Sequence, residues 1–290
     1  MAVEERDPHT GYMTTGHEWN GIKELNTPVP KPVFFFLAVT AAFAVVYWLL
    51  MPAWPLGVTY TRGLLGIDQR RTVAESLEEA AAQRAAWTQH IESADFAEIQ
   101  ADPRLMAIVR QTGRTLFGDN CSVCHGTHAT GGPGFPNLTS GSWLWGGEPA
   151  AIAETVRVGI NATHPDTRTG QMLAFGKDGI LPRADVEKVV TYVQSLSDPA
   201  IAATPEQLDA GREIFLANCA TCHGDDGKGK TDTGAPNLTD RFWIYGGDRQ
   251  SIFATVYGGR QGHMPSWEGR LSPVDRKILA LYVLDLGQRK

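Results

Sequence analysis

All four cysteines of this 290-residue chain lie in two copies of one pattern, CSVCH at residues 121–125 and CATCH at residues 219–223. A thiol pair beside a histidine can do four kinds of chemistry. It can form a disulfide, act as a thiol redox pair, bind zinc, or attach a haem covalently. The surroundings of the two copies decide among these readings.

Three of the four readings fit the sequence poorly. A disulfide across two residues closes almost no loop, so it would add little stability. A thioredoxin-like pair needs a strand before the motif, whereas each copy here follows a helical pattern. A zinc site would draw both pairs together, yet each pair has its own matching surroundings. Cys-x-x-Cys-His is the signature of c-type haem attachment, so we expect two covalently bound haems c, attached through thioethers with the histidine coordinating each iron. The attaching residues would be Cys121, Cys124, Cys219 and Cys222, and the iron ligands would be His125 and His223.

A second axial ligand for each iron should follow each motif, and in electron-transfer cytochromes c it is usually methionine. Met172 lies in RTGQMLAFG and Met264 lies in GRQGHMPSW, both before the final helical pattern of a repeat. A single methionine is more often a core residue, but the matched positions favour ligation. His128, His164 and His263 are the alternative ligands. Two irons with both axial positions filled would transfer electrons and carry out no bond chemistry.

The chain repeats itself around the two motifs. GRTLFGDNCSVCHG begins at Gly113 and GREIFLANCATCHG begins at Gly211, and each is followed by a PNLT segment and an amphipathic helical pattern. Self-similarity of this kind indicates duplicated structural units. We therefore predict two tandem cytochrome c domains, at residues 104–198 and 205–290, separated by a short linker.

The N-terminal third is organised differently. Val33 to Met51 is free of charge and long enough to cross a bilayer as a helix. A signal peptide is the competing interpretation, but the polar stretch before the apolar segment is long and no small-residue cleavage site follows. We predict a polar head at 1–32, a transmembrane helix at 33–52, and a connector at 53–103 containing a helix from Thr72 to His90. The fold class is mainly α, with a single N-terminal transmembrane helix followed by the two cytochrome c domains.

Composition and motif chemistry constrain location and partners. The net charge of −6 is mild and gives no sign of nucleic-acid binding. Haem is attached to such motifs outside the bacterial cytoplasm. The head should therefore be cytoplasmic, and both haem domains should lie in the periplasm, anchored to the inner membrane.

The N-terminal segment carries a more specific resemblance. GHEWNGIKELN, the apolar span and PAWPLGVTYTRGLLG resemble the start of subunit III, the dihaem cytochrome c subunit, of cbb3-type cytochrome c oxidases, and the resemblance covers the full chain. It implies an electron-accepting subunit of a proton-pumping oxidase, without a catalytic centre of its own. Electrons would come from a donor cytochrome c and pass to a monohaem cytochrome c subunit. They would then reach a catalytic subunit with b-type haem and copper, which reduces oxygen to water.

The resemblance also implies ligand sets. Carried over in chain order, it assigns the first haem to Cys121, Cys124, His125 and Met172, and the second to Cys219, Cys222, His223 and Met264.

Two other functions stay open at this point. One is the cytochrome c subunit of a periplasmic dehydrogenase, which would carry electrons away from substrate oxidation. The other is a membrane-tethered carrier without a fixed partner.

Overall fold

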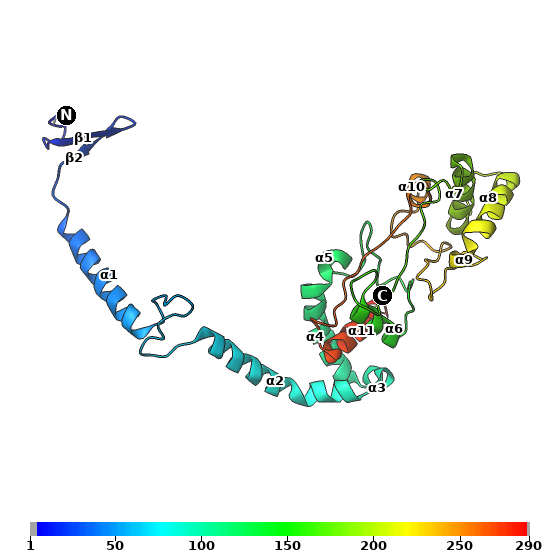
Figure 1. The fold of residues 1–290 in the computed structure, drawn as a ribbon, viewed down its shortest axis with the longest axis horizontal. Helices are drawn as coiled ribbons and strands as arrows, with labels where there is room; N and C mark the ends of the chain where they lie inside the picture. Colours follow the sequence, from blue (N-terminus) through cyan, green and yellow to red (C-terminus); the bar gives the residue numbers. More distant parts are fainter. Residues whose placement is uncertain (1–4, 289–290) are drawn as a thin grey trace. The chain divides into compact units, whose positions relative to one another are not determined.

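The computed structural model describes residues 5–288 of the chain, which divides into two compact units, residues 1–83 and 84–290. The described residues form eleven helices and one two-stranded sheet, in agreement with the predicted mainly α fold. Figure 1 shows the order of the elements along the chain. Each unit is described separately below.

The polar head forms a β-hairpin that the sequence analysis did not predict. Strand β1 (Thr14–Trp19) pairs antiparallel with β2 (Ile22–Leu25). Asn20 and Gly21 connect them with φ angles of 47° and 84°. Two successive residues with positive φ match the twist of a tight hairpin turn, and Asn-Gly is the pair that most readily adopts it.

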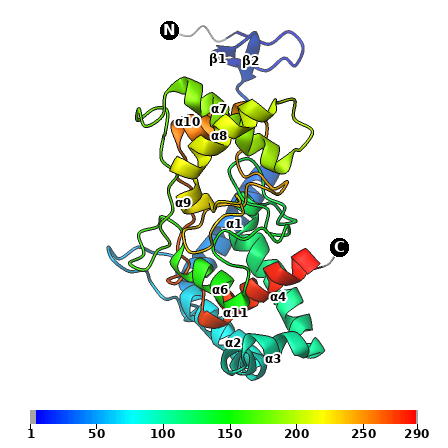
Figure 2. The same ribbon diagram turned by 90° about the vertical axis from the view of Figure 1, so that its right-hand side faces the viewer.

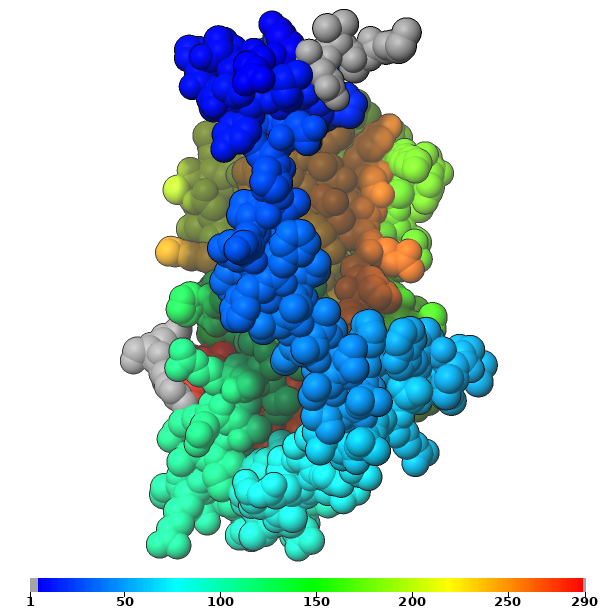
Figure 3. Space-filling model, turned by 90° about the vertical axis from the view of Figure 1, so that its left-hand side faces the viewer, coloured from blue at the N-terminus to red at the C-terminus, as the bar shows by residue number. Residues whose placement is uncertain are grey.

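Helix α1 (Lys31–Leu50) is the one described helix that is long and apolar enough to cross a membrane. Its 20 residues rise about 30 Å, the thickness of a bilayer hydrocarbon core. None of its residues is buried against the rest of the chain, and Figure 3 shows it in blue as a narrow run of uncovered side chains. The hydroxyl of Thr40 donates to the carbonyl of Phe36 at 2.8 Å, so its polar atom is satisfied within the helix.

The connector contains the predicted helix with wider limits. Helix α2 runs over Gln69–Ser93, against the predicted range of Thr72 to His90. Before it, the rings of Trp48 and Trp54 lie 5.0 Å apart at the C-terminal end of α1. Aromatic side chains of this kind are enriched at membrane interfaces, which suits the end of a spanning helix.

The second unit contains two matching sets of helices. Asp102 accepts hydrogen bonds from the first turn of α4, and Thr204 forms a capping box with Gln207 at the start of α8, so both long N-terminal helices begin at capped residues. The first set is α3 (Phe96–Ala101), α4 (Pro103–Asn120), α5 (Ser122–His125), α6 (Pro149–Val158) and α7 (Arg183–Ser197). The second set is α8 (Pro205–Asn218), α9 (Ala220–His223), α10 (Arg249–Gly258) and α11 (Pro273–Gln288).

The final helix of each repeat packs against helices of the other repeat. Helix α11 contacts α4 and α6, while α7 contacts α8 and α10. Figures 1 and 2 both show α11, in red, beside α4 and α6, and α7 grouped with α8 and α10. The sequence analysis treated 104–198 and 205–290 as separate domains, and the observed helix contacts run across that division.

Two hydrophobic cores result from this exchange. The first core contains Phe117 of α4 together with Ile278 and Tyr282 of α11. The second core contains Val189 of α7 together with Phe215 of α8. We call these the first core and the second core.

A glycine allows each exchanged helix pair to approach closely. A Cβ added to Gly113 of α4 would lie 2.6 Å from the Cβ of Tyr282 in α11. A Cβ added to Gly211 of α8 would lie 2.7 Å from the Cβ of Tyr192 in α7. The two repeats therefore use the same glycine-on-tyrosine contact, each with the partner helix of the other repeat.

Candidate haem sites

Each motif histidine is held by a backbone carbonyl of the loop that follows it. The Nδ1 atom of His125 lies 3.2 Å from the carbonyl oxygen of Pro136, and Nδ1 of His223 lies 3.1 Å from that of Pro236. A carbonyl oxygen only accepts, so Nδ1 carries the proton and donates it, which leaves the Nε2 lone pair of each ring for a metal. Burial lowers the pKa of both imidazoles, so both stay neutral, as an iron ligand must be.

The histidine loops have the same geometry in both repeats. Gly131 donates to the carbonyl of His125 at 2.9 Å, and Gly229 donates to that of His223 at 2.7 Å. A Cβ on Gly131 would come within 2.5 Å of a loop carbonyl, so the loop closes only with glycine at this position. The prolines whose carbonyls accept hydrogen bonds from the histidines belong to the shared PNLT segments. The sequence shows this segment in both repeats, and in each repeat its proline carbonyl accepts a hydrogen bond from the motif histidine.

The cysteine pairs lack the features of a disulfide or of a thiol redox pair. The described residues contain no disulfide, and Cys121 and Cys219 are half-buried while Cys124 and Cys222 are exposed. Burial, and secondarily the neighbouring thiol, raises the pKa of Cys121 and of Cys219 to about 11. Redox-active Cys-x-x-Cys pairs have a lowered thiol pKa, so these pairs do not fit that class. Among residues 5–288 there is also no cluster of three or more His, Cys, Asp or Glu side chains suited to a metal ion, as the zinc reading would require.

The methionines lie with the opposite motifs from those assigned in the sequence analysis. Met264 packs against the first core, together with Cys121. Met172 packs against the second core, together with Cys219. The sequence analysis grouped Met172 with the first motif and Met264 with the second, as chain order suggests. Each methionine packs against the core that also takes the first motif cysteine of the other repeat, because the final helix and the segment before it cross over together.

Backbone pairing fixes the crossed segments in register. Met264 exchanges two hydrogen bonds of 2.9 Å with Ile160, which follows α6 of the first repeat. Met172 exchanges hydrogen bonds of 2.8 and 3.0 Å with Arg260, which follows α10 of the second repeat. Ile160 and Arg260 are equivalent positions in the two repeats, so the two methionine segments occupy equivalent places.

Two arginines beside the methionine segments were missed from the sequence. The guanidinium of Arg168 lies 5.2 Å from the ring of Trp145, and its Nε donates to the hydroxyl of Thr155 at 2.8 Å. Arg260 makes the same pair of contacts, with Tyr245 at 4.4 Å and Thr255 at 3.0 Å. Thr155 and Thr255 occupy equivalent positions in the two repeats, whereas the two arginines do not, so comparing the repeats gives no signal for the arginines.

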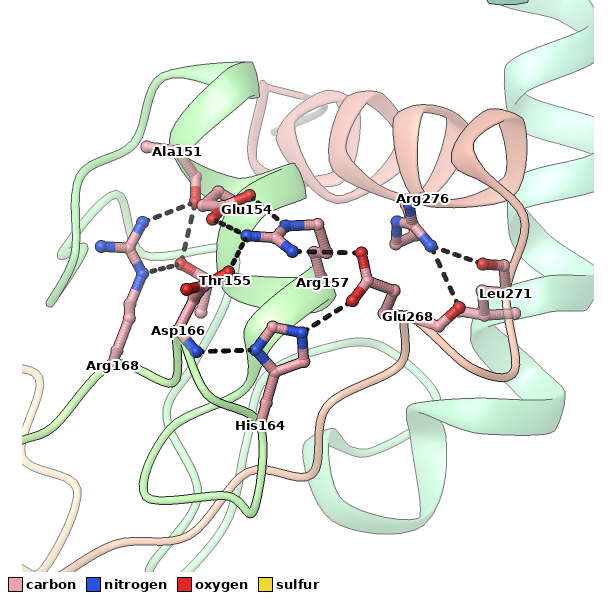
Figure 4. Close-up of polar contacts among 10 residues, drawn as sticks. All are labelled: Ala151, Glu154, Thr155, Arg157, His164, Asp166, Arg168, Glu268, Leu271 and Arg276. Atoms are coloured by element: carbon pink, nitrogen blue, oxygen red, sulfur yellow. Dashed lines mark hydrogen bonds and ion pairs between the residues drawn. The ribbon is translucent and has the colours of Figure 1, made fainter.

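A charged network ties the segment after Met264 to the first repeat. Arg157 of α6 binds Glu154, Asp166 and Glu268 at 2.8, 3.0 and 3.1 Å, and Nε2 of His164 lies 2.7 Å from Glu268 (Figure 4). The sequence leaves His164 as one of the alternative iron ligands. It lies in a loop, and its side chain is only 9% exposed and is engaged in this network. His164 is therefore occupied elsewhere than at an iron.

The loops after the two motifs face one another across a cleft of about 300 Å³. Trp143 and Trp243, which occupy equivalent positions in the two repeats, both line it, and they pack against the first and second cores respectively. The backbone nitrogen of Gly134 donates to the carbonyl of Ile244 across the two repeats at 2.8 Å. Each repeat thus contributes the same elements to the cleft.

Both motif regions fit a covalently held haem. Each offers two cysteines that form no disulfide, a neutral imidazole that is at least partly buried and has Nε2 available, and a methionine at the same core. Both repeats offer the same set of donor groups, so the arrangement suits two equivalent cofactors rather than one shared cofactor.

Three family models match the chain. The N-terminal domain of cytochrome oxidase-cbb3, FixP, matches residues 11–58; cytochrome c matches 111–197; and cytochrome C oxidase, cbb3-type, subunit III matches 206–283. A cbb3-type cytochrome c oxidase subunit FixP from Bradyrhizobium sp. (strain ORS 278) is 46% identical over 99% of this chain and 98% of its own length. A CcoP subunit from Azospirillum sp. (strain B510) is 43% identical over the full length of both chains. Another from Cereibacter sphaeroides is 42% identical over 94% of both chains.

Proposed function

Because the chain belongs to the FixP/CcoP family of cbb3-type cytochrome c oxidase subunits, we propose that it is the dihaem subunit that accepts electrons from a donor cytochrome c and relays them to the oxidase core. The observation that carries this proposal is the pair of matched sites. Each combines a Cys-x-x-Cys-His motif with a histidine oriented by a proline carbonyl. The monohaem cytochrome c subunit and the b-type haem and copper subunit are the proposed partners.

The residues of the chain have separate tasks in this function. Cys121 and Cys124 would hold the first haem by thioethers, and Cys219 and Cys222 the second, while the motif histidines would coordinate the irons. Haem c supplies an iron that takes up and gives back one electron at a time. The side chains here bind and orient the cofactor, and the two apolar cores exclude water from it. With methionine as the second axial ligand, neither iron would keep an open position for a substrate, so oxygen reduction would belong to the partner subunit.

The first unit supports a membrane-anchored arrangement. Helix α1 carries an uncovered apolar surface over its whole length, which is stable only in lipid or against another protein. We propose that it crosses the bacterial inner membrane once, with the β-hairpin head in the cytoplasm and both haem sites in the periplasm. The match of residues 11–58 to the FixP N-terminal domain disfavours the dehydrogenase reading, for which no such head is expected.

The proposal is tested by a cofactor inventory of the intact complex. The chain is tagged at its C-terminus, extracted from membranes in mild detergent and purified without dissociating its partners. We expect two c-type haems in this chain, with b-type haem and copper co-purifying, and oxygen consumption with reduced cytochrome c. A preparation that contains only c-type haem under the gentlest extraction would refute the oxidase assignment and favour a tethered carrier.

A further inference from the structure

We propose that the two haem sites exchange their axial methionines: Met264 completes the site of His125, and Met172 completes the site of His223. This inference rests on the proposed dihaem function and specifies how the sites of that function are built. It assigns each iron one ligand from each repeat. It also predicts that neither repeat contains a complete haem site by itself.

The pairing register carries the first part of the argument. If each repeat folded on itself, Ile160 would pair with Met172, and Arg260 would pair with Met264. The observed pairs are Ile160 with Met264 and Met172 with Arg260, each through two backbone hydrogen bonds of 2.8–3.0 Å. The bonds made are the same in kind and number, so the exchange preserves the local structure of both segments and changes only which repeat supplies them.

The exchange also includes the residues that follow each methionine. After Met264, the nitrogen of Trp267 donates to the carbonyl of Val156 in α6 at 3.1 Å. After Met172, the nitrogen of Phe175 donates to the carbonyl of Val256 in α10 at 3.1 Å. Val156 and Val256 are again equivalent positions. Both methionine segments therefore lie along the equivalent helix of the other repeat, and the exchange is not confined to one residue.

The charged network around Arg157 can form only in the exchanged arrangement. Glu268, four residues after Met264, binds Arg157 of α6 at 3.1 Å and His164 at 2.7 Å. Both partners belong to the first repeat (Figure 4). An uncrossed chain would separate Glu268 from these partners.

One side chain holds both crossing segments. The amide nitrogen of Asn161 donates to the carbonyl of Gly170 at 2.8 Å and to the carbonyl of Gly262 at 2.7 Å. Gly170 lies two residues before Met172, and Gly262 lies two residues before Met264. Asn161 has a φ of 49°, a conformation that asparagine tolerates better than most residues. We therefore assign Asn161 as a positioning residue for both methionines.

The assignment is tested in the full-length haem-loaded chain by marking one haem. Cys121→Ala leaves the first haem with a single thioether and one unreacted vinyl group, which displaces its reduced absorption band to longer wavelength. Each haem can then be titrated separately by its own band. In this background, Met264→His and Met172→His are compared. Histidine in place of methionine lowers the reduction potential of a c-type haem.

The expected result is that Met264→His lowers the potential of the marked first haem and Met172→His lowers that of the unmarked second haem. The reverse pattern would overturn the exchange while leaving methionine ligation intact. A chain in which neither substitution changes either potential would overturn methionine ligation itself. Met106→Leu is the control, because Met106 is buried in the first core but lies outside the exchanged segments, and we expect both potentials to be unchanged.

Asn161→Asp tests the positioning role separately. Aspartate keeps the size and the acceptor oxygen of asparagine but loses the amide protons that Gly170 and Gly262 accept. We expect the methionine–iron absorption band of the oxidised protein to weaken at both haems, with attachment of both haems retained. Asn161→Gly, which tolerates the positive φ but also lacks the amide, should behave in the same way. Loss of thermal stability with full methionine–iron absorption in both variants would show that Asn161 is only structural.

Discussion

The exchange of helices between repeats can be measured without reference to the haems, through two aromatic pairs. The rings of Phe117 in α4 and Tyr282 in α11 lie 6.0 Å apart, and those of Phe215 in α8 and Tyr192 in α7 lie 5.3 Å apart. Both pairs join helices from different repeats. In an unexchanged fold, Phe117 would instead face Tyr192, and Phe215 would face Tyr282.

A double-mutant cycle on Phe117 and Tyr282 gives the magnitude. Phe117 is 2% exposed, so Phe117→Leu should lower the free energy of unfolding by roughly 1–3 kcal/mol, below the cost of complete truncation to alanine. Tyr282→Leu should act similarly. Aromatic pairs at this separation contribute about 0.5–1.5 kcal/mol beyond their buried area, so the double variant should fall short of additivity by that amount. Phe117→Leu combined with Tyr192→Leu should be additive within about 0.5 kcal/mol, because those residues pack in different cores.

The assay is urea unfolding of the full-length haem-loaded chain in detergent, followed by far-ultraviolet circular dichroism. The four cycles that combine either phenylalanine with either tyrosine are measured under identical conditions. A coupling energy between Phe117 and Tyr192, with none between Phe117 and Tyr282, would refute the exchanged arrangement. Equal coupling in all four cycles would refute it as well, because it would indicate a general loss of cooperativity.

Two further outcomes are expected from the segment around Met264. Gly159 has a φ of 71°, and a Cβ there would lie 2.4 Å from the carbonyl oxygen of Met264. Gly159→Ala should therefore displace the Met264 segment and lower the free energy of unfolding by more than about 1 kcal/mol. Urea unfolding measures this difference. Gly269→Ala is the matched control, since its Cβ would meet open space. Hydrogen bonds from His164, and then from Arg157, lower the pKa of Glu268 from 4.5, so its stabilising contribution is present above about pH 4.5 and is lost as the pH falls through the lowered value. The stability difference between the native chain and Glu268→Gln should therefore shrink between pH 7 and pH 3.5.

Either prediction can fail clearly. An unchanged stability in Gly159→Ala, at the level of the Gly269→Ala control, would show that the Met264 segment does not dock against the end of α6. A stability difference for Glu268→Gln that is constant down to pH 3.5 would show that the Glu268 carboxylate contributes nothing through its charge.

Local patterns in the sequence were sufficient for most of the elements. The apolar run from Val33 to Met51 corresponds to α1, and the helix predicted from Thr72 to His90 corresponds to α2, which has wider limits. These elements depend on residues close together in the chain. The hairpin of the head was missed although its signal was present, since Asn20-Gly21 between extended residues indicates a tight turn.

The exchange between repeats could not be predicted from the same patterns. The final helices α7 and α11 present the same amphipathic spacing, and each carries a tyrosine that fits a glycine on α4 or α8. Such a sequence specifies that each final helix packs against a helix with the matching glycine. It does not specify whether that helix belongs to the same repeat or to the other repeat. The choice depends on the connecting segments, where the Asn161 side chain binds two segments of the chain, around Gly170 and Gly262, that are far apart in sequence. The loop sequence around Asn161 gives no indication of that role.

The contact between α4 and α11 also has a consequence for the order of folding. These helices are separated by both attachment motifs, so the first core closes a very long chain loop, whereas the second core is built within the continuous segment from Met172 to Arg260. Contacts of low sequence separation form faster than distant ones. The second motif should therefore reach its native surroundings before the first, although it is synthesised later. The first motif would then lie in an incomplete core until α11 has been synthesised and has packed against α4.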